Sequence, residues 1–329
     1  MKRFLVLPLV CVMALAVSGP SFAHTGLEFF LQEVPDPDAM TMDGDDSDWG
    51  WFDNDLGLDS NLDFFLCVGG CGASTGDIID PEDYSAFWRI AYSRPPDNRL
   101  YFFLRILDDS LKRQEPDLRR MWHDDFTQFN MDTDHSGGPG LGANREEASN
   151  HQRYHMRIMP GPDGITAFNS QIEVLGDEAL GWTQDVDFDG NFTGVWDLTW
   201  TVNPPDAQNG TLDVEVTWEG RLKTYDAVAL SEGESVRHVY NGDQVTHLGP
   251  RLTDNDGLPG LFQYDMYLKD RFTGQEPAAT YGTEGDGFPD WFTIPCENCP
   301  NAGGSGGGMT AVESSSWGRI KSHLGSQLK

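Results

Sequence analysis

Residues 100–107, LYFFLRIL, decide the fold class of this chain of 329 residues. The run is apolar, rich in aromatic residues and bounded by turn-forming residues, as β-strands are. Comparable short runs, alternating or aromatic-rich, recur along the chain between clusters of Gly, Pro, Asn and Asp. They predict further strands at residues 126–131, 153–158, 164–174, 195–202, 211–218 and 261–268. Helix is predicted only in short pieces, such as residues 80–87 and 146–151.

These patterns predict an all-β protein, a single elaborated antiparallel β-sandwich of the jelly-roll or immunoglobulin-like kind, with long loops. No period of about 20 to 50 residues recurs, which excludes propellers and solenoids. The body is expected to span residues 24–300, followed by a Gly/Ser linker at residues 301–310. Residues 311–329 are predicted to form a short basic amphipathic tail, either a sorting or docking segment that binds a partner or an inert terminus.

The first 23 residues have the pattern of a signal peptide. Lys2 and Arg3 precede an apolar run, and the small-residue cleavage site Ser21-Phe22-Ala23 follows it. The protein is therefore predicted to be exported, to a periplasmic, extracellular or cell-surface location. No later run is long and apolar enough for a transmembrane segment.

The net charge of the chain limits the classes of partner that it can bind. The chain has 53 acidic and 22 basic residues, a formal net charge of −31. Such a surface repels phosphate backbones and anionic lipids, so nucleic-acid binding is excluded, and neutral ligands or cations are favoured.

Four cysteines follow the predicted signal peptide, in two close pairs: Cys67 with Cys71, and Cys296 with Cys299. An oxidising compartment favours disulfides over a structural zinc site. Their connectivity, local or across the chain, stays open.

Acidic loops predict structural calcium, because hard cations prefer several closely spaced oxygen ligands. Asp185, Asp187 and Asp189 before Gly190 match the start of a calcium loop, but position twelve is Trp196 rather than Glu. Asp132 with Asp134, and the run Asp254-Asn255-Asp256-Gly257, are weaker versions of the pattern. The alternative interpretation of each is a solvated Asx turn.

Catalytic motifs are missing from the sequence. His151 and His155 have the spacing of a zinc-protease helix, but Gln152 stands where the general-base Glu is needed. We therefore expect a protein that is not an enzyme. Trp122 lies in a polar stretch before a predicted strand, where an exposed indole could stack on a sugar ring.

Three blocks carry a resemblance to a known family. Residues 42–49, MDGDDSDW, residues 97–109, DNRLYFFLRILDD, and residues 122–132, WHDDFTQFNMD, occur in the order found in carbohydrate-binding module family 9 and related sugar- or haem-binding domains. After residue 160 the match is weak.

The resemblance implies a calcium-bound β-sandwich in which two tryptophans clamp a sugar. Trp122 stands at one clamping position, and Gln128 replaces a Glu that hydrogen-bonds the sugar. If strand parity holds, His155 and Arg157 take the polar positions of the next strand. Trp291 is the candidate for the second clamping Trp. Together they predict binding of an oligo- or polysaccharide.

Three other functions compete with sugar binding. The first is a structural or adhesion protein with the same fold and no sugar site. The second is an electron-transfer subunit that binds haem b through side chains such as Met121, His123, His155 or Met156. The third is a copper enzyme that uses His24, the first residue after the predicted cleavage site.

Overall fold

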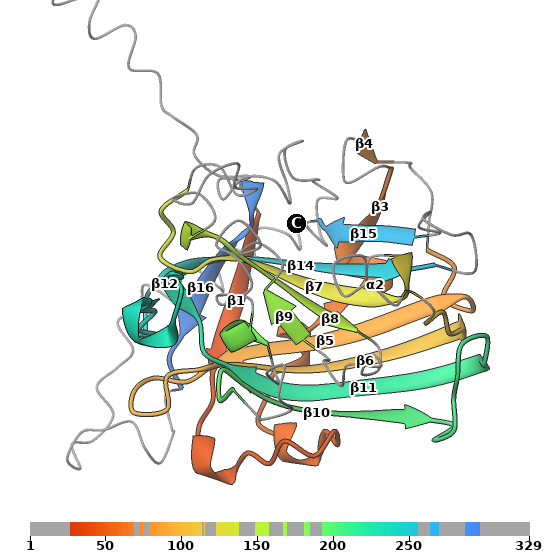
Figure 1. Ribbon diagram of the computed structural model, residues 1–329, viewed down its shortest axis with the longest axis horizontal. Coiled ribbons are helices and arrows are strands. Elements are labelled where there is room, and N and C mark those ends of the chain that lie inside the picture. The colour runs from red at the N-terminus through yellow and green to blue at the C-terminus, as the bar shows by residue number, and fades with distance from the viewer. Residues whose placement is uncertain are drawn as a thin grey trace, which may run out of the picture.

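The strand predicted at residues 100–107 is β6, Leu100–Ser110, in the computed structural model (Figure 1). It pairs antiparallel with β5, Tyr84–Tyr92, on one side and with β11, Leu212–Leu222, on the other. β10, Trp196–Asn203, extends this layer beyond β11. The structure describes residues 27–68, 73–74, 79–113, 115, 123–137, 149–157, 167–169, 181–184, 193–255, 264–269 and 287–296.

A second layer is organised around β14, Val245–Asp254, which pairs with β7, β15 and β16, all antiparallel. β8 and β9 continue this layer beyond β7, and β3 and β4 continue it beyond β15. The bounds are Phe126–Asp132 for β7, Gln152–Arg157 for β8, Ala167–Asn169 for β9, Tyr264–Leu268 for β15, Asp290–Ile294 for β16, Phe64–Val68 for β3 and Ala73–Ser74 for β4.

β1, Glu28–Glu33, connects the two layers. It pairs in parallel with β16 along most of its length and with β5 at its end, through Gln32 and Glu33. The sheet is therefore mixed around β1 rather than purely antiparallel. Both pairings join segments far apart in the sequence, so local patterns carry no sign of them.

Aromatic rings fill the space between the layers. Phe129 of β7 lies 4.4 Å from Trp88 of β5 and 5.5 Å from Phe102 of β6, measured between ring centroids. Tyr154 of β8 lies 5.2 Å from Trp196 of β10. All five side chains are buried, so the two layers pack face to face. The predicted all-β sandwich is confirmed.

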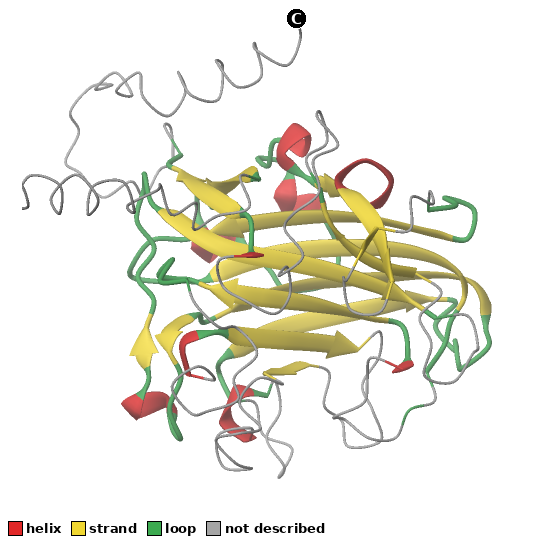
Figure 2. Ribbon diagram, turned by 90° about the horizontal axis from the view of Figure 1, so that it is seen from above, coloured by secondary structure: helices red, strands yellow, loops and turns green. Residues whose placement is uncertain are grey.

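The remaining described elements are short and lie at the edges of the sandwich (Figure 2). They are β2, Leu58–Asp59; α2, Ser60–Asp63; β12, Tyr225–Ala227; β13, Val236–Arg237; and 3-10 turns at Pro37–Ala39, Ser47–Trp49, Asn54–Leu56 and Glu232–Glu234. No helix in the described part of the chain is long and apolar enough to cross a membrane.

Two sequence predictions differ from the structure. The predicted helix at residues 80–87 is wrong, because a turn leads into β5 and burial alternates along this strand from Tyr84 to Ile90. β9 covers only part of the strand predicted at residues 164–174, and much of that range lies outside the described residues. Residues 1–26 and 297–329 also lie outside them, so the signal peptide, the linker and the tail stay predictions.

Candidate functional site

Three predicted site residues lie together on the outer face of the second layer. Gln128 of β7 pairs directly with His155 of β8, and Arg157 pairs with Phe126, two residues earlier on β7. Phe129 points the other way, into the core. Because side chains alternate along a strand, Gln128, His155 and Arg157 share the face opposite to Phe129.

Arg251 of β14, which sequence reasoning missed, occupies the centre of this face. It pairs with Gln128 across the strands, and its Nη1 donates a hydrogen bond to Gln128 Oε1 at 3.2 Å. Its Nε donates to Asp265 Oδ1 at 2.6 Å. The guanidinium also lies over the rings of Phe126 and Tyr267, at 5.5 and 5.1 Å from their centroids. The face thus combines fixed polar groups with aromatic surface.

Burial shapes the electrostatics of this face. Gln128, His155 and Arg157 are each 5% exposed or less. Burial, together with nearby Arg153 and Arg251, holds the pKa of His155 well below its usual range, so the imidazole is neutral at pH 7. Desolvation, with a contribution from Arg251, lowers the pKa of the Arg153 guanidinium to about 10. The face is a cationic strip in a chain of net charge −31.

Of the two tryptophans predicted to stack on a sugar, the structure describes only Trp291. Trp291 is a core residue: it is 1% exposed, stacks on Phe29 at 5.0 Å and donates its indole N–H to the Leu248 carbonyl at 2.8 Å. A ring packed in this way offers no face to a sugar, which corrects the expectation for Trp291. Trp122 lies outside the described residues.

Only part of the predicted calcium loops lies within the described residues. Asp185, Asp187 and Asp189 lie outside the described residues. The Asp132 carboxylate holds a turn, because it accepts hydrogen bonds from the Ser136 and Gly137 backbone N–H groups at 3.2 and 2.8 Å. Asp134 Oδ1 accepts from the same Ser136 N–H at 3.2 Å. This arrangement matches the Asx-turn alternative.

A different acidic cluster forms at the other end of β7. Asp108 at the end of β6, Asp125 just before β7 and Asp254 at the end of β14 are all buried, and one carboxylate oxygen from each lies within 4.8 Å of the others. Burial raises the pKa of Asp108 to about 6. Burial and the charges of Asp108 and Asp254 raise the pKa of Asp125. Closely spaced carboxylate oxygens are the ligand type that a hard cation such as calcium prefers.

Each aspartate of this cluster lies in a motif noted in the sequence, but the three motifs are separated along the chain. Asp108 and Asp125 lie within two of the blocks that resemble family 9, and Asp254 begins one of the weaker acidic loops. The pairing of β7 with β14, which places Phe126 opposite Thr253, brings Asp125 and Asp254 together. Asp108 reaches them from β6 of the other layer.

Two of the haem ligands proposed from the sequence point to opposite faces of β8. His155 lies on the outer face of β8, whereas its neighbour Met156 points into the core and is fully buried. His123 Nδ1 lies 2.9 Å from Glu115 Oε2. Met121 and His24 lie outside the described residues, and so do Cys71 and Cys299 and the side chain of Cys67, so cysteine pairing stays a prediction.

Known proteins resemble this chain in fold rather than in sequence. No family model matches the sequence, and no curated protein matches it. Among solved structures, the chain is similar to a carbohydrate-binding module of family 9 from Caldicellulosiruptor kristjanssonii in complex with cellotriose, with 9% identity, a TM-score of 0.44 and coverage of 85% of this chain and 99% of that one. The same module with glucose gives 9% identity, a TM-score of 0.45 and coverage of 83% and 99%.

Proposed function

We propose that this chain is an exported, non-catalytic carbohydrate-binding β-sandwich. A saccharide would bind at the outer face of β7, β8 and β14, with Gln128, His155 and Arg157 as hydrogen-bonding groups and Trp122 as the stacking platform. The observation that carries the proposal is the face that Gln128, His155 and Arg157 share beside Arg251. The Arg251 guanidinium is held between Asp265 and the aromatic rings of Phe126 and Tyr267.

The chemistry of the face suits a sugar. Saccharides need fixed donors and acceptors for their hydroxyl groups beside an apolar ring face. Gln128 is held by Arg251 on one side and donates to Asn130 Oδ1 on the other, so its amide is oriented before any ligand arrives. Arg153, Arg157 and Arg251 line this strip. We therefore expect its ligands to include saccharides that carry carboxylates.

A glycan array and pull-down screen on the full chain tests this function, with neutral and carboxylate-bearing glycans in the panel. We expect binding, with the glycan recovered intact, and a loss of at least about tenfold in affinity in Trp122→Ala. Trp200→Ala is the matched control, because Trp200 is a half-buried tryptophan on β10 of the other layer. Equal binding by both variants would refute Trp122 as the platform.

Burial of the strip favours the second candidate function, a structural or adhesion protein with the same fold. Gln128 is 1% exposed and His155 3% exposed in this structure. A face that stays closed would bind none of the glycans, while the protein remains folded and cooperative in thermal unfolding. That result would replace the carbohydrate-binding proposal.

Calcium belongs to the same proposal, with Asp108, Asp125 and Asp254 as its ligands. Three buried carboxylates repel one another, and a divalent cation would convert this repulsion into attraction. At a calcium concentration of about 100 times the dissociation constant, we expect about 2.7 kcal/mol of added stability over the chelated protein. Thermal unfolding with calcium and with chelator measures it.

The variant Asp108→Asn distinguishes the loss of calcium binding from a loss of stability of the fold itself. Asn keeps the oxygen that accepts the Ser110 N–H at 2.8 Å but removes one negative charge. We expect its chelated form to be at least as stable as the wild type and its response to calcium to be lost. Asp97→Asn, outside the cluster, should keep the calcium response. A full response in Asp108→Asn would show that calcium binds elsewhere.

A further inference from the structure

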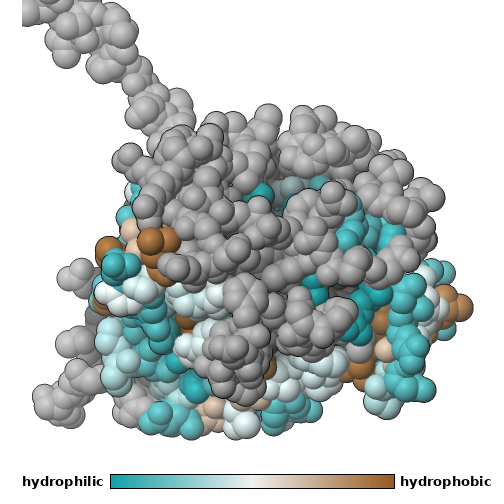
Figure 3. Space-filling model, in the orientation of Figure 1, coloured by the Kyte–Doolittle hydropathy of each residue, from teal (hydrophilic) through white to brown (hydrophobic). Residues whose placement is uncertain are grey.

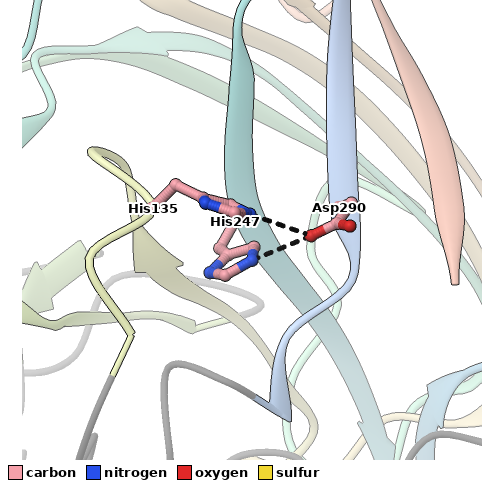
Figure 4. Close-up of side chains that lie close together, drawn as sticks. All are labelled: His135, His247 and Asp290. Carbon is pink, nitrogen blue, oxygen red and sulfur yellow. Dashed lines mark hydrogen bonds and ion pairs between the residues drawn. The ribbon is translucent and has the colours of Figure 1, made fainter. Parts of the chain in front are cut away.

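Two histidines and an aspartate meet at one end of the second layer (Figure 4). His135 lies in the turn after β7, His247 near the start of β14, and Asp290 is the first residue of β16. Asp290 Oδ1 lies 2.9 Å from His247 Nε2 and 3.2 Å from His135 Nε2. One ligand atom from each of the three residues lies within 4.8 Å of the others.

Strand register explains why they meet. His247 pairs with Asp290 on β16 and with Asp132 on β7, so the three side chains stand side by side on one face of the layer. The turn after Asp132 then brings His135 over His247, with ring centroids 3.9 Å apart. The Asp132 carboxylate accepts hydrogen bonds from Ser136 in this turn and so fixes the position of His135.

Asp132 also orients the buried ring of His247. Its Oδ2 lies 3.1 Å from His247 Nδ1. With Nδ1 bonded to this carboxylate, Nε2 is the ring nitrogen that faces Asp290 and His135 and can bind a metal ion. This is the arrangement by which metal-binding histidines are held in proteins.

A further histidine borders the group. His151 is 2% exposed, its Nε2 lies 4.0 Å from Asp132 Oδ2, and neither of its ring nitrogens has a hydrogen-bond partner within the described part of the chain. A buried imidazole with both nitrogens unsatisfied is costly in a protein that binds nothing there.

We propose that His135, His247 and Asp290 bind a divalent transition-metal ion of the zinc type. The ligand atoms are His135 Nε2, His247 Nε2 and an oxygen of Asp290, and Asp132 positions His247. Two imidazole nitrogens favour zinc over calcium, which prefers an all-oxygen site. In tetrahedral zinc with bonds of about 2.0 to 2.1 Å, ligand atoms lie about 3.3 Å apart. The separations of 2.9 and 3.2 Å at Asp290 Oδ1 need only a small opening to accept the ion.

The site is reachable from solvent and distinct from the proposed calcium cluster. The side chains of His135 and Asp290 are 27% and 16% exposed, whereas that of His247 is fully buried. Asp125 and Asp132 flank opposite ends of β7, so the two clusters lie about 20 Å apart at the rise of an extended strand. The zinc proposal therefore stands whether or not a saccharide or calcium binds.

Calorimetric titration of zinc chloride into the chelator-treated full chain tests the proposal. We expect one tight site in the wild type and a loss of affinity of about 100-fold or more in His135→Ala and in Asp290→Asn. His123→Ala is the matched control, because its side chain is also 27% exposed and also faces a carboxylate, that of Glu115. This control should bind zinc as the wild type does.

Cobalt substitution distinguishes the histidine site from the cysteines. Cobalt(II) bound by nitrogen and oxygen gives visible d–d bands without the near-ultraviolet thiolate charge-transfer band. Loss of the visible bands in His135→Ala, with unchanged circular dichroism, would support the proposal. A thiolate band in the wild type, zinc affinity in His135→Ala equal to that of the wild type, or no tight site at all would each overturn it.

Discussion

Replacing Phe129 by alanine is expected to lower the free energy of unfolding by about 3 to 5 kcal/mol. Phe129 is fully buried between the two layers and contacts the rings of Trp88 and Phe102. Its removal takes away apolar burial and leaves a cavity lined by two large aromatic side chains, which rigid strands on both sides cannot close. Denaturant unfolding at saturating calcium measures the difference.

Leu212→Ala provides the comparison for this measurement. Leu212 is the first residue of β11 and is 66% exposed, so its truncation should change stability by no more than about 0.5 kcal/mol. The exposed large apolar side chains of the described surface are few, in keeping with the predominantly hydrophilic or intermediate residues of the face in Figure 3. A cost below about 1 kcal/mol for Phe129→Ala would contradict the packing of the two layers through this residue.

The strands that the sequence predicted correctly are those with a local signal. Alternation along β7 and β8 was sufficient to place Gln128, His155 and Arg157 on one face, because a period of two fixes which side chains point together. β14 gave no such signal. It contains Gly249 and Pro250, which is typical of a turn, yet it lies at the centre of a layer and pairs with three strands.

Sites built from distant segments could not be predicted in the same way. His247 is 115 residues from Asp132 and 43 residues from Asp290, and only the register of β14 with β7 and β16 makes them adjacent. The burial of Trp291 likewise depends on β1, which lies at the other end of the chain and places Phe29 against the indole. Neither the adjacency of His247 to these aspartates nor the packing of Phe29 on Trp291 can be read from composition or spacing.

A second large loss of stability is expected from Glu219→Ala in β11. The Glu219 carboxylate accepts three hydrogen bonds from the block at residues 42–49: from Trp49 Nε1 at 2.8 Å, and from the backbone N–H groups of Asp43 and Gly44, each at 2.9 Å. Alanine would leave these donors unsatisfied, at about 1 to 3 kcal/mol for each buried one. We expect a total loss of roughly 3 to 5 kcal/mol, measured by denaturant unfolding.

Two variants separate the role of Glu219 as an acceptor from that of its charge. Burial raises the pKa of Glu219 to about 7, so the comparison belongs at pH 8, where the carboxylate is ionised. Glu219→Gln keeps one acceptor oxygen and should lose about half as much as the alanine variant. Glu215→Ala, which removes only a partly exposed ion pair with Arg105 on the same strand pair, should cost less than about 1 kcal/mol. Equal losses in Glu219→Ala and Glu215→Ala would mean that other contacts hold the block at residues 42–49. Among these, the Thr199 and Thr217 hydroxyls donate to the Met42 and Gly44 carbonyls at 2.7 Å, and Arg89 pairs with Asp46 at 2.8 Å.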